Sequence, residues 1–374
     1  MRKLNISQVC TFFANGSYPI EFLLFFPNRI DTKKLRQSLR KIARVFWPAF
    51  GTYTNGIITE QKYIEAEIYD ETDVPEDFDP SIAQEELYYR FGPLISKSIS
   101  RLFYLKVIHY NNGTVLITKM NHLVGDGYSY FYMLSVLAAV TKRTGVPLIP
   151  AILCSISKPK IYSKLHEGFL FLEKPPERNT NYDDLVVEVM EVGQVETREQ
   201  AKIASEKSNL NVSTNDILCA QLLKLILKSK KQKSSKNLTL VIPVDMRKAV
   251  PELGQRFFGD GLILHRVTFT TDDVSQKSVE DLAIKIKDEF PERTSQNYLE
   301  FLTTIENWIA TKNMQKLQLY DSEKEFLVTN LSRMPITRLD FGSGLPKLIV
   351  PLTRGKSGAA ILTQNDKFIL QLGR

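Results

Sequence analysis

The stretch that decides the fold reads Asn-His-Leu-Val-Gly-Asp-Gly at residues 121–127. Residues 114–120, just before it, are rich in β-branched and apolar side chains, which is typical of a strand. Residues 128–142, just after it, are mostly apolar and predict a largely buried helix. His122 and Asp126 are therefore predicted to lie at a corner where a strand passes into a helix, with small glycines that let the chain turn sharply.

A histidine at such a corner can carry acid and base chemistry. A neutral imidazole, with an ordinary pKa of about 6.5, can take a proton from a hydroxyl or amine and later return it to a leaving group. The chain has four histidines, and the other three are His109, His166 and His265. Two of these fall inside predicted strands and one in an irregular stretch, so His122 is the candidate catalytic base.

The first half of the chain carries further local signals. Residues 18–26 predict a strand that Pro27 ends, and Asp31 is placed to cap a helix whose apolar residues recur at helical spacing up to residue 46. Residues 102–109 and 114–120 predict two strands of a hairpin, joined through Asn-Asn-Gly at 111–113. The opening domain is thus expected to mix strands and helices.

The chain is long enough for two domains, since 374 residues exceed what one core usually organises. We expect a first domain at 1–160, a polar and proline-containing crossover at 161–184, and a second domain at 185–374. Strands in the second half are predicted at 185–189, 237–244, 261–270, 326–331, 347–352 and 359–370, and helices at 197–208, 217–223, 278–290 and 296–317. This intermixing predicts the α/β class with mixed sheets.

Composition sets limits on partners. The formal charge of +7 favours anionic partners, but no arginine-rich helix or aromatic RNA-binding signature points to nucleic acid. The lysine-rich run at 228–236 is expected to be a solvated loop, with contact to a cofactor phosphate as the alternative. Cys10, Cys154 and Cys219 are dispersed, which predicts no disulfide framework, no metal site and a reducing, cytoplasmic location.

Targeting segments are not evident in the sequence. The N-terminus continues into polar residues instead of an apolar signal core. The longest apolar stretch, residues 131–140, is far shorter than the roughly 20 residues that a membrane-spanning helix needs. No membrane span is therefore expected.

Two motifs together resemble a known family. His-Leu-Val-Gly-Asp-Gly at 122–127 resembles the HxxxDG motif of the BAHD acyltransferases and the wider chloramphenicol acetyltransferase-like superfamily. Asp-Phe-Gly-Ser-Gly-Leu-Pro at 340–346 resembles their DFGWG motif. Further segments follow the family's order, at residues 35–51, 213–216, 244–247 and 258–260. The resemblance implies two similar domains of mixed sheet with flanking helices and a channel at their interface.

The resemblance also implies a reaction. His122 would be the general base for moving an acyl group from acyl-CoA to the hydroxyl or amine of a small molecule, with acyl-CoA as a cosubstrate and no tightly bound cofactor. Asp126 would be structural and pair with Arg247 across the domain junction, and Gly127 would shape the same loop.

Other family segments imply further roles. Asp340, Gly342 and Gly344 would shape a loop on the second domain, distant from the chemistry. The segment at 213–216 resembles a helix start of the family, and Ser213 with Thr214 is the candidate cofactor-binding pair. The four residues also satisfy the pattern of a capping box, in which Ser213 and Asp216 cap the helix.

The sequence departs from the family at Ser343, where the family has Trp, and at Asp260, where it has Asn. The chain is also shorter than the plant enzymes. A condensation-type enzyme that accepts a carrier-protein thioester is the alternative, although its motif has a second histidine where this chain has Asn121. Two further alternatives are a ping-pong mechanism through Cys219 and a catalytically silent ligand-binding protein of the same fold.

Overall fold

The structure, a computed structural model, describes residues 1–6, 8–16, 19–95, 101–144, 152–153, 170–171, 186–229, 237–251, 253–254, 256–310, 317–321, 324–352, 357–364 and 366–373. The chain forms two compact units. Unit 1 contains residues 1–160, 250–261 and 334–353, and unit 2 contains residues 161–249, 262–333 and 354–374. The second domain that we expected at 185–374 is therefore interrupted twice. Apart from residues 170–171, the expected crossover lies outside the described residues.

Unit 1 is built on a five-stranded sheet with the order β16-β2-β7-β6-β5. The strands are β16 (Leu348–Pro351), β2 (Ile20–Phe26), β7 (Gly113–Met120), β6 (Phe103–Tyr110) and β5 (Tyr69–Asp73). The predicted hairpin is confirmed, because β6 pairs with β7 antiparallel and Tyr110 lies opposite Gly113. A Cβ on Gly113 would lie 2.1 Å from the carbonyl oxygen of Phe26, so only glycine fits this turn. The β5 strand, which pairs parallel to β6, was not predicted.

Strand β2 is apolar along nearly its whole length because both of its faces are covered. On one face, Phe22 contacts the rings of Tyr130 and Phe131 in helix α4 (Gly127–Lys142), at centroid distances of 5.4 and 5.1 Å. On the other face, Leu23 and Phe25 belong to a cluster that includes Leu87 of helix α3 (Gln84–Ile95). The sheet therefore fixes α4, which begins at the last residue of the HxxxDG motif.

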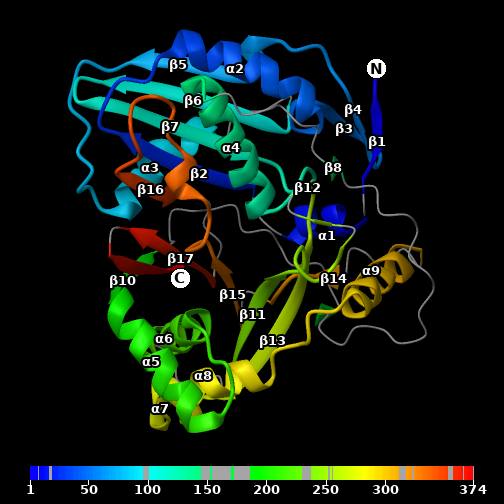
Figure 1. The fold of residues 1–374 in the computed structure, drawn as a ribbon, viewed down its shortest axis with the longest axis vertical. Helices are drawn as coiled ribbons and strands as arrows, with labels where there is room; N and C mark the ends of the chain where they lie inside the picture. The colour runs from blue at the N-terminus through cyan, green and yellow to red at the C-terminus, as the bar shows by residue number, and fades with distance from the viewer. Residues whose placement is uncertain are drawn as a thin grey trace. The chain divides into compact units, whose positions relative to one another are not determined.

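Helix α2 (Thr32–Val45) packs beside α4, as Figure 1 shows. The carboxylate of Asp31 accepts a hydrogen bond from the backbone N–H of Lys34 at 3.0 Å, which confirms the predicted cap. Leu35, Leu39 and Ile42 are buried along one face of the helix. This amphipathic pattern is what made α2 predictable.

Several short elements of unit 1 were not predicted. They are helix α1 (Gln8–Gly16), a small sheet of β1 (Lys3–Asn5), β4 (Ile57–Thr59) and β3 (Thr52–Thr54), the pair β8 (Ile152–Leu153) and β12 (Phe257–Phe258), and the 3₁₀ turns η1 (Trp47–Phe50), η2 (Glu65–Glu67) and η4 (Ile336–Arg338). Strands of two or three residues are too short to show a period, so sequence pattern does not find them.

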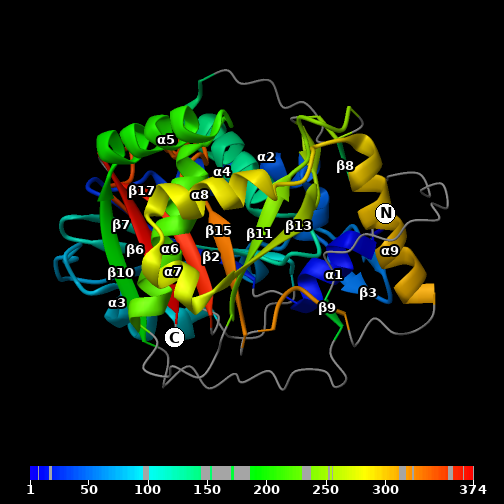
Figure 2. The same cartoon turned by 90° about the horizontal axis from the view of Figure 1, so that it is seen from below.

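Unit 2 contains a six-stranded sheet with the order β10-β18-β17-β15-β11-β13. The strands are β10 (Val187–Gly193), β18 (Lys367–Gly373), β17 (Gly358–Gln364), β15 (Glu325–Asn330), β11 (Asn237–Asp245) and β13 (Leu262–Thr270). The helices are α5 (Gln194–Ser208), α6 (Thr214–Ser229), α7 (Thr271–Gln276), α8 (Val279–Asp288) and α9 (Ser295–Ala310), and β9 (Leu170–Phe171) pairs with β14 (Leu317–Gln318). Figure 2 shows α5, α6 and α8 grouped together.

The start of α6 confirms the predicted capping box. The Ser213 backbone N–H donates to the Asp216 carboxylate at 2.7 Å, and the Asp216 N–H donates to the Ser213 hydroxyl at 3.4 Å. The helix predicted at 296–317 is described only as far as Ala310. Across the residues that the structure describes, no helix is long and apolar enough to span a membrane.

Candidate active site

His122 lies in the turn between β7 and α4, where the sequence predicted it. The side-chain oxygen of Asn121 accepts a hydrogen bond from the backbone N–H of Leu123 at 2.9 Å, and its carbonyl accepts one from Val124 at 3.0 Å. These bonds close a tight turn that displays the next side chain. The side chain of His122 is 16% exposed, so the imidazole keeps some access to solvent.

Asp126 begins α4 and ties a distant segment to it. Its carboxylate accepts a hydrogen bond from the backbone N–H of Ser129 at 3.0 Å, as an N-cap does, and a second one from the N–H of Gly261 at 3.1 Å. The residue is only 1% exposed. Asp126 therefore satisfies two buried amides at once, and one of them belongs to a segment far away in the sequence.

The segment around Gly259 is held against the same helix turn. The Ser129 hydroxyl donates to the Gly259 carbonyl at 2.9 Å and accepts from the Gly259 N–H at 3.1 Å. A Cβ on Gly125 would lie 2.7 Å from the Ser129 Cβ and 3.2 Å from the Gly259 nitrogen. Gly125 is therefore required for this close approach. Neither Gly125 nor Gly127 has a positive φ, so the predicted sharp turn does not depend on left-handed backbone.

The same segment places a second carboxylate beside the histidine. One carboxylate oxygen of Asp260 lies 3.5 Å from the Nδ1 atom of His122, and the Asp260 side chain is fully buried. Burial raises the pKa of Asp260; hydrogen bonds from His122 and the Cys10 thiol lower it, and the nearby Asp126 adds to the rise. The Phe13 ring stacks beside the imidazole at a centroid distance of 6.5 Å. The imidazole is thus held between a carboxylate and an aromatic ring.

Sequence reasoning did not place Asp260, Cys10 or Phe13 at this site. Asp260 was noted only as a departure from the family's asparagine. Helix α1, which carries Cys10 and Phe13, was not predicted. One signal in the sequence could have pointed to Asp260. It directly follows Phe258 and Gly259, and an aspartate in such an apolar stretch needs a polar partner if it is buried.

Two predicted site groups lie in unit 2. The Arg247 guanidinium is 3.2 Å from the Asp245 carboxylate, and its predicted partner belongs to unit 1, so that pairing stays a prediction. Ser213 donates its hydroxyl to Asp216 at 2.7 Å, and Thr214 is the first residue of α6. The cofactor-binding role of Ser213 and Thr214 also stays a prediction.

The structure weighs against Cys219 as a nucleophile. Cys219 is fully buried in α6, and burial raises the pKa of its thiol strongly. A thiolate is the reactive form, so this cysteine behaves as a small apolar residue. Cys154, His166 and the lysine-rich run from residue 230 onwards lie outside the described residues. Within the described part, no cluster of His, Cys, Asp and Glu is arranged to hold a metal ion.

The DFGSG segment belongs to unit 1, although we expected it on the second domain. One oxygen of Asp340 accepts hydrogen bonds from the backbone N–H groups of Gly342 at 2.8 Å and Gly344 at 3.0 Å, and the other oxygen pairs with Lys142 at the end of α4. Both glycines have φ values above +90°, which favour glycine. The Phe341 ring packs against Phe26 at 5.6 Å. The segment is therefore a turn that fastens the far end of α4.

We expect Asp340→Ala to lower the free energy of unfolding by about 1–3 kcal/mol, because two backbone hydrogen bonds and an ion pair are lost together. Urea denaturation would measure the change. Lys142→Met is the matched control, since it removes only the ion pair, and such exposed pairs contribute about 0–1 kcal/mol. Equal losses in the two variants would show that the turn does not depend on the Asp340 carboxylate.

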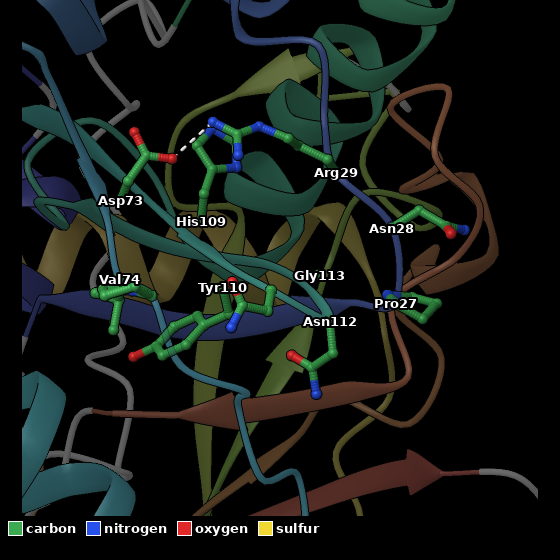
Figure 3. Close-up of a pocket in the computed structure, with 11 residues that line it drawn as sticks. Pro27, Asn28, Arg29, Asp73, Val74, His109, Tyr110, Asn112 and Gly113 are labelled. Carbon is green, nitrogen blue, oxygen red and sulfur yellow. Dashed lines mark hydrogen bonds and ion pairs between the residues drawn. The ribbon is translucent and has the colours of Figure 1, made fainter.

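A pocket of about 680 Å³ lies at the other end of the unit 1 sheet. Figure 3 shows Arg29 and Asp73 meeting near His109 in its wall, and the Arg29 guanidinium is 2.6 Å from the Asp73 carboxylate. Strand β7 runs from Gly113, which lines the pocket, to Met120, just before His122. At about 3.3 Å per residue these strand ends are roughly 23 Å apart, so this pocket is separate from the HxxxDG corner.

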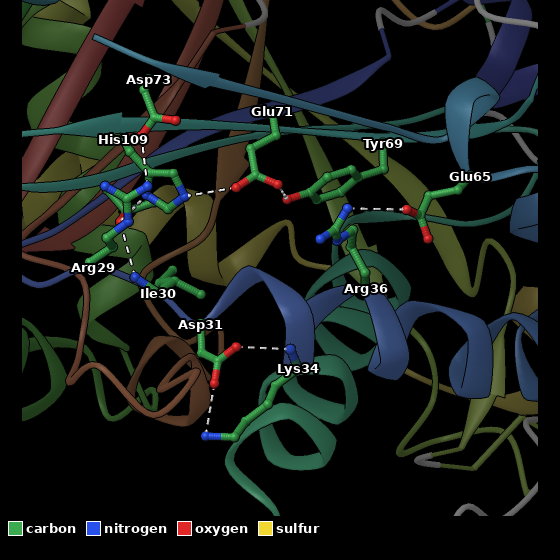
Figure 4. A network of polar contacts seen from close by, with 11 residues as sticks. Arg29, Ile30, Asp31, Lys34, Arg36, Glu65, Tyr69, Glu71, Asp73 and His109 are labelled. Atoms are coloured by element: carbon green, nitrogen blue, oxygen red, sulfur yellow. Dashed lines mark hydrogen bonds and ion pairs between the residues drawn. The ribbon is translucent and has the colours of Figure 1, made fainter. Parts of the chain in front are cut away.

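His109 is the buried centre of a polar network, which Figure 4 shows. The Thr114 hydroxyl accepts a hydrogen bond from the Ile30 N–H at 3.1 Å and lies 3.2 Å from His109 Nδ1, so its own proton is available to Nδ1. His109 Nε2 lies 3.2 Å from a Glu71 oxygen whose partner oxygen accepts from Tyr69 at 2.7 Å. The network therefore selects a neutral imidazole protonated on Nε2.

This network predicts a pH dependence of stability. Burial, and then repulsion by Arg29, lower the pKa of His109, although Glu71 acts in the opposite direction. The unfolded chain then binds more protons than the folded chain, so this contribution is complete above the ordinary pKa of about 6.5 and is lost as pH falls from there towards the lowered pKa. We expect His109→Gln to reduce the loss of stability between about pH 7.5 and pH 5.5 by up to about 1.4 kcal/mol per pH unit. Urea midpoints at both pH values test this, and an unchanged pH dependence would contradict it.

Comparison with known proteins agrees with this fold. The profile of the Transferase family matches residues 63–368. A solved structure of F. graminearum TRI101 with coenzyme A and deoxynivalenol is similar with a TM-score of 0.77 at 14% identity, covering 100% of this chain and 95% of that one. Vinorine synthase is similar with a TM-score of 0.71 at 18% identity, covering 100% and 90%. No curated protein sequence matches significantly.

These solved structures share the two-domain mixed α/β fold, and the predicted fold class is confirmed. The chain belongs to the transferase family of the BAHD acyltransferases, as its motifs indicated. The first condensation domain of the calcium-dependent antibiotic synthetase is also similar, with a TM-score of 0.60 at 12% identity, covering 99% of this chain and 90% of that one. At such identities, likeness to solved structures establishes the fold alone.

Proposed function

We propose that this protein transfers an acyl group from acyl-CoA to the hydroxyl or amine of a small molecule, with His122 as the general base. The observation that carries the proposal is the position of His122 within a chain that belongs to an acyltransferase family. The imidazole is partly exposed, stands in a fixed turn and has a carboxylate at its Nδ1 atom. The similar TRI101 protein was solved in complex with coenzyme A and the small molecule deoxynivalenol, which supports the choice of donor.

The proposed reaction proceeds in one complex of enzyme, donor and acceptor. The His122 imidazole removes the proton of the acceptor hydroxyl or amine, and the freed lone pair attacks the thioester carbonyl carbon. The resulting tetrahedral intermediate collapses, the bond from carbon to sulfur breaks, and the imidazolium gives its proton to the coenzyme A thiolate. No acyl-enzyme forms, which agrees with the burial of Cys219. We propose no metal and no tightly bound cofactor.

The second candidate is transfer from a carrier-protein thioester. The similarity to a condensation domain favours it, but the TM-score is lower than for TRI101. In this chain Asn121 takes the place of a second histidine, and its side chain closes the turn. We therefore place the free acyl-CoA donor first. The dispersed cysteines support a cytoplasmic location as part of the proposal.

Thiol release from a panel of acyl-CoAs with mixed alcohol and amine acceptors tests the proposal. We expect turnover with at least one donor, and the preferred donor and acceptor then define the substrate class. The same panel loaded on an acyl carrier protein tests the second candidate. If coenzyme A binds but neither form of donor is consumed, the chain is a ligand-binding member of the family.

A further inference from the structure

We propose that Asp260 is a positioning residue for the general base, holding the His122 imidazole in the tautomer whose Nδ1 carries the proton. The inference rests on the proposed function of His122 and adds a group to it. Asp260 follows Gly259 in a segment that was expected to lie in the second domain and belongs to unit 1. The two side chains are 138 positions apart in the sequence and 3.5 Å apart in space.

The identity of the atoms decides the tautomer. Burial raises the pKa of Asp260, but the contacts with His122 and the Cys10 thiol favour its ionised form. An ionised carboxylate has only acceptor sites, so the nitrogen that faces it then carries a hydrogen. Nδ1 is the nitrogen of His122 that faces Asp260. Nε2 then keeps its lone pair and is the basic atom. At 3.5 Å the bond is long, as catalytic hydrogen bonds often are before substrate binds.

The backbone around Asp260 is fastened on both sides. Gly259 exchanges hydrogen bonds with the Ser129 hydroxyl, and the Gly261 N–H donates to Asp126. Ser129 stands in the first turn of α4 and Asp126 is the N-cap of that helix, a few residues after His122. The segment that carries the carboxylate is therefore fastened to the helix start that directly follows the imidazole, and such fixed placement is what a positioning residue requires.

A fully buried carboxylate is costly unless it serves a partner. The titratable groups around Asp260 are His122 and Asp126, which follow β7, and Cys10 of α1. The Cys10 thiol donates a hydrogen bond to the carboxylate, and His122 attracts it, whereas Asp126 repels it. When His122 takes a proton from the acceptor, its imidazolium gains the attraction of Asp260.

Asp260→Asn tests the inference, because asparagine has nearly the same shape without the charge. We expect kcat to fall about 10- to 10³-fold while the KM of the donor changes little. This loss of kcat is smaller than the one seen when the aspartate of a Ser-His-Asp catalytic triad is replaced by asparagine. In a plot of kcat against pH, the fall in rate on the acidic side, the acidic limb, should move to lower pH, because protonated His122 loses the negative charge of Asp260. The unfolding midpoint should stay equal or rise, because a buried charge is removed. A purely structural residue would instead lower the midpoint and leave the acidic limb in place.

Nitrogen-15 NMR of the histidine-labelled chain tests the tautomer directly. Above about pH 8, where imidazoles are neutral, we expect the His122 proton on Nδ1. His109 is an internal reference, because its network selects the Nε2 proton. The His122→Ala variant assigns the signal. Ser129→Ala is the control variant: it removes the hydrogen bonds to Gly259 but keeps the carboxylate, so the midpoint should fall and the tautomer should remain.

The outcomes separate this inference from the proposed function. A His122 proton on Nε2 in the wild-type chain would overturn the inference whatever the activity. An Asp260→Asn variant with the wild-type kcat and acidic limb would also overturn it. If no acyl transfer is found but the proton lies on Nδ1, the inferred contact stands and the proposed reaction fails.

Discussion

Replacement of His122 by alanine should lower kcat by about 10²- to 10⁴-fold, the contribution that a general base usually makes. The fold should survive, because the side chain is partly exposed, lies in a turn and makes no backbone hydrogen bond that the turn requires. The turn depends on Asn121, whose oxygen atoms accept from Leu123 and Val124. The measurement is thiol release under saturating donor, with the unfolding midpoint recorded for the same sample.

His265→Ala is the matched control for this prediction. His265 is also a histidine next to an aromatic ring, with Phe290 at 5.2 Å, but it lies in β13 of unit 2. We expect this variant to keep the rate per folded molecule within a small factor of the wild type. A His122→Ala variant that retains the wild-type rate would remove the general base from the mechanism.

The sequence predicted the corner around His122 because its determinants are local. A strand, a turn and a capped helix follow one another within about thirty residues, and each has its own pattern. The N-cap residue Asp31 and the capping box of Ser213 with Asp216 were found for the same reason. Each of these features depends on residues that are close together in the sequence, so the local sequence pattern is enough to predict it.

The partners of the corner could not be predicted, because they come from remote segments. Asp260 is more than a hundred residues from His122, and Cys10 belongs to a helix of nine residues without a described side-chain cap. The DFGSG segment was recognised in the sequence, but its location in unit 1 was not predicted. Its assignment to unit 1 follows from β16, which pairs with β2, and from the ion pair of Asp340 with Lys142. Those contacts depend on strand order, which local pattern does not contain.

Replacement of Asp126 by alanine should lower the free energy of unfolding by roughly 1.5–5 kcal/mol, the largest stability loss that we expect. The helix loses its N-cap, which contributes about 0.5–2 kcal/mol, and the buried amide of Gly261 loses its acceptor, which costs about 1–3 kcal/mol. Urea denaturation measures the change. The rate per folded molecule should fall as well, because the segment that carries Asp260 loses its hydrogen bond to the Asp126 carboxylate and keeps only weaker anchoring through Ser129 and the Asp126 backbone N–H among the contacts at this helix start.

Asp126→Asn separates the two contributions. Asparagine is also a good N-cap, so its oxygen can keep the bond to the Ser129 N–H. Its amide nitrogen is a donor and would face the Gly261 N–H, which is also a donor. We therefore expect stability between that of the wild type and the alanine variant. If the asparagine variant is as stable as the wild type, the hydrogen bond to Gly261 contributes nothing to stability. If it is only as stable as the alanine variant, the N-cap hydrogen bond contributes nothing. Either result would locate the stabilisation that keeps His122 and Asp260 together in one of the two hydrogen bonds.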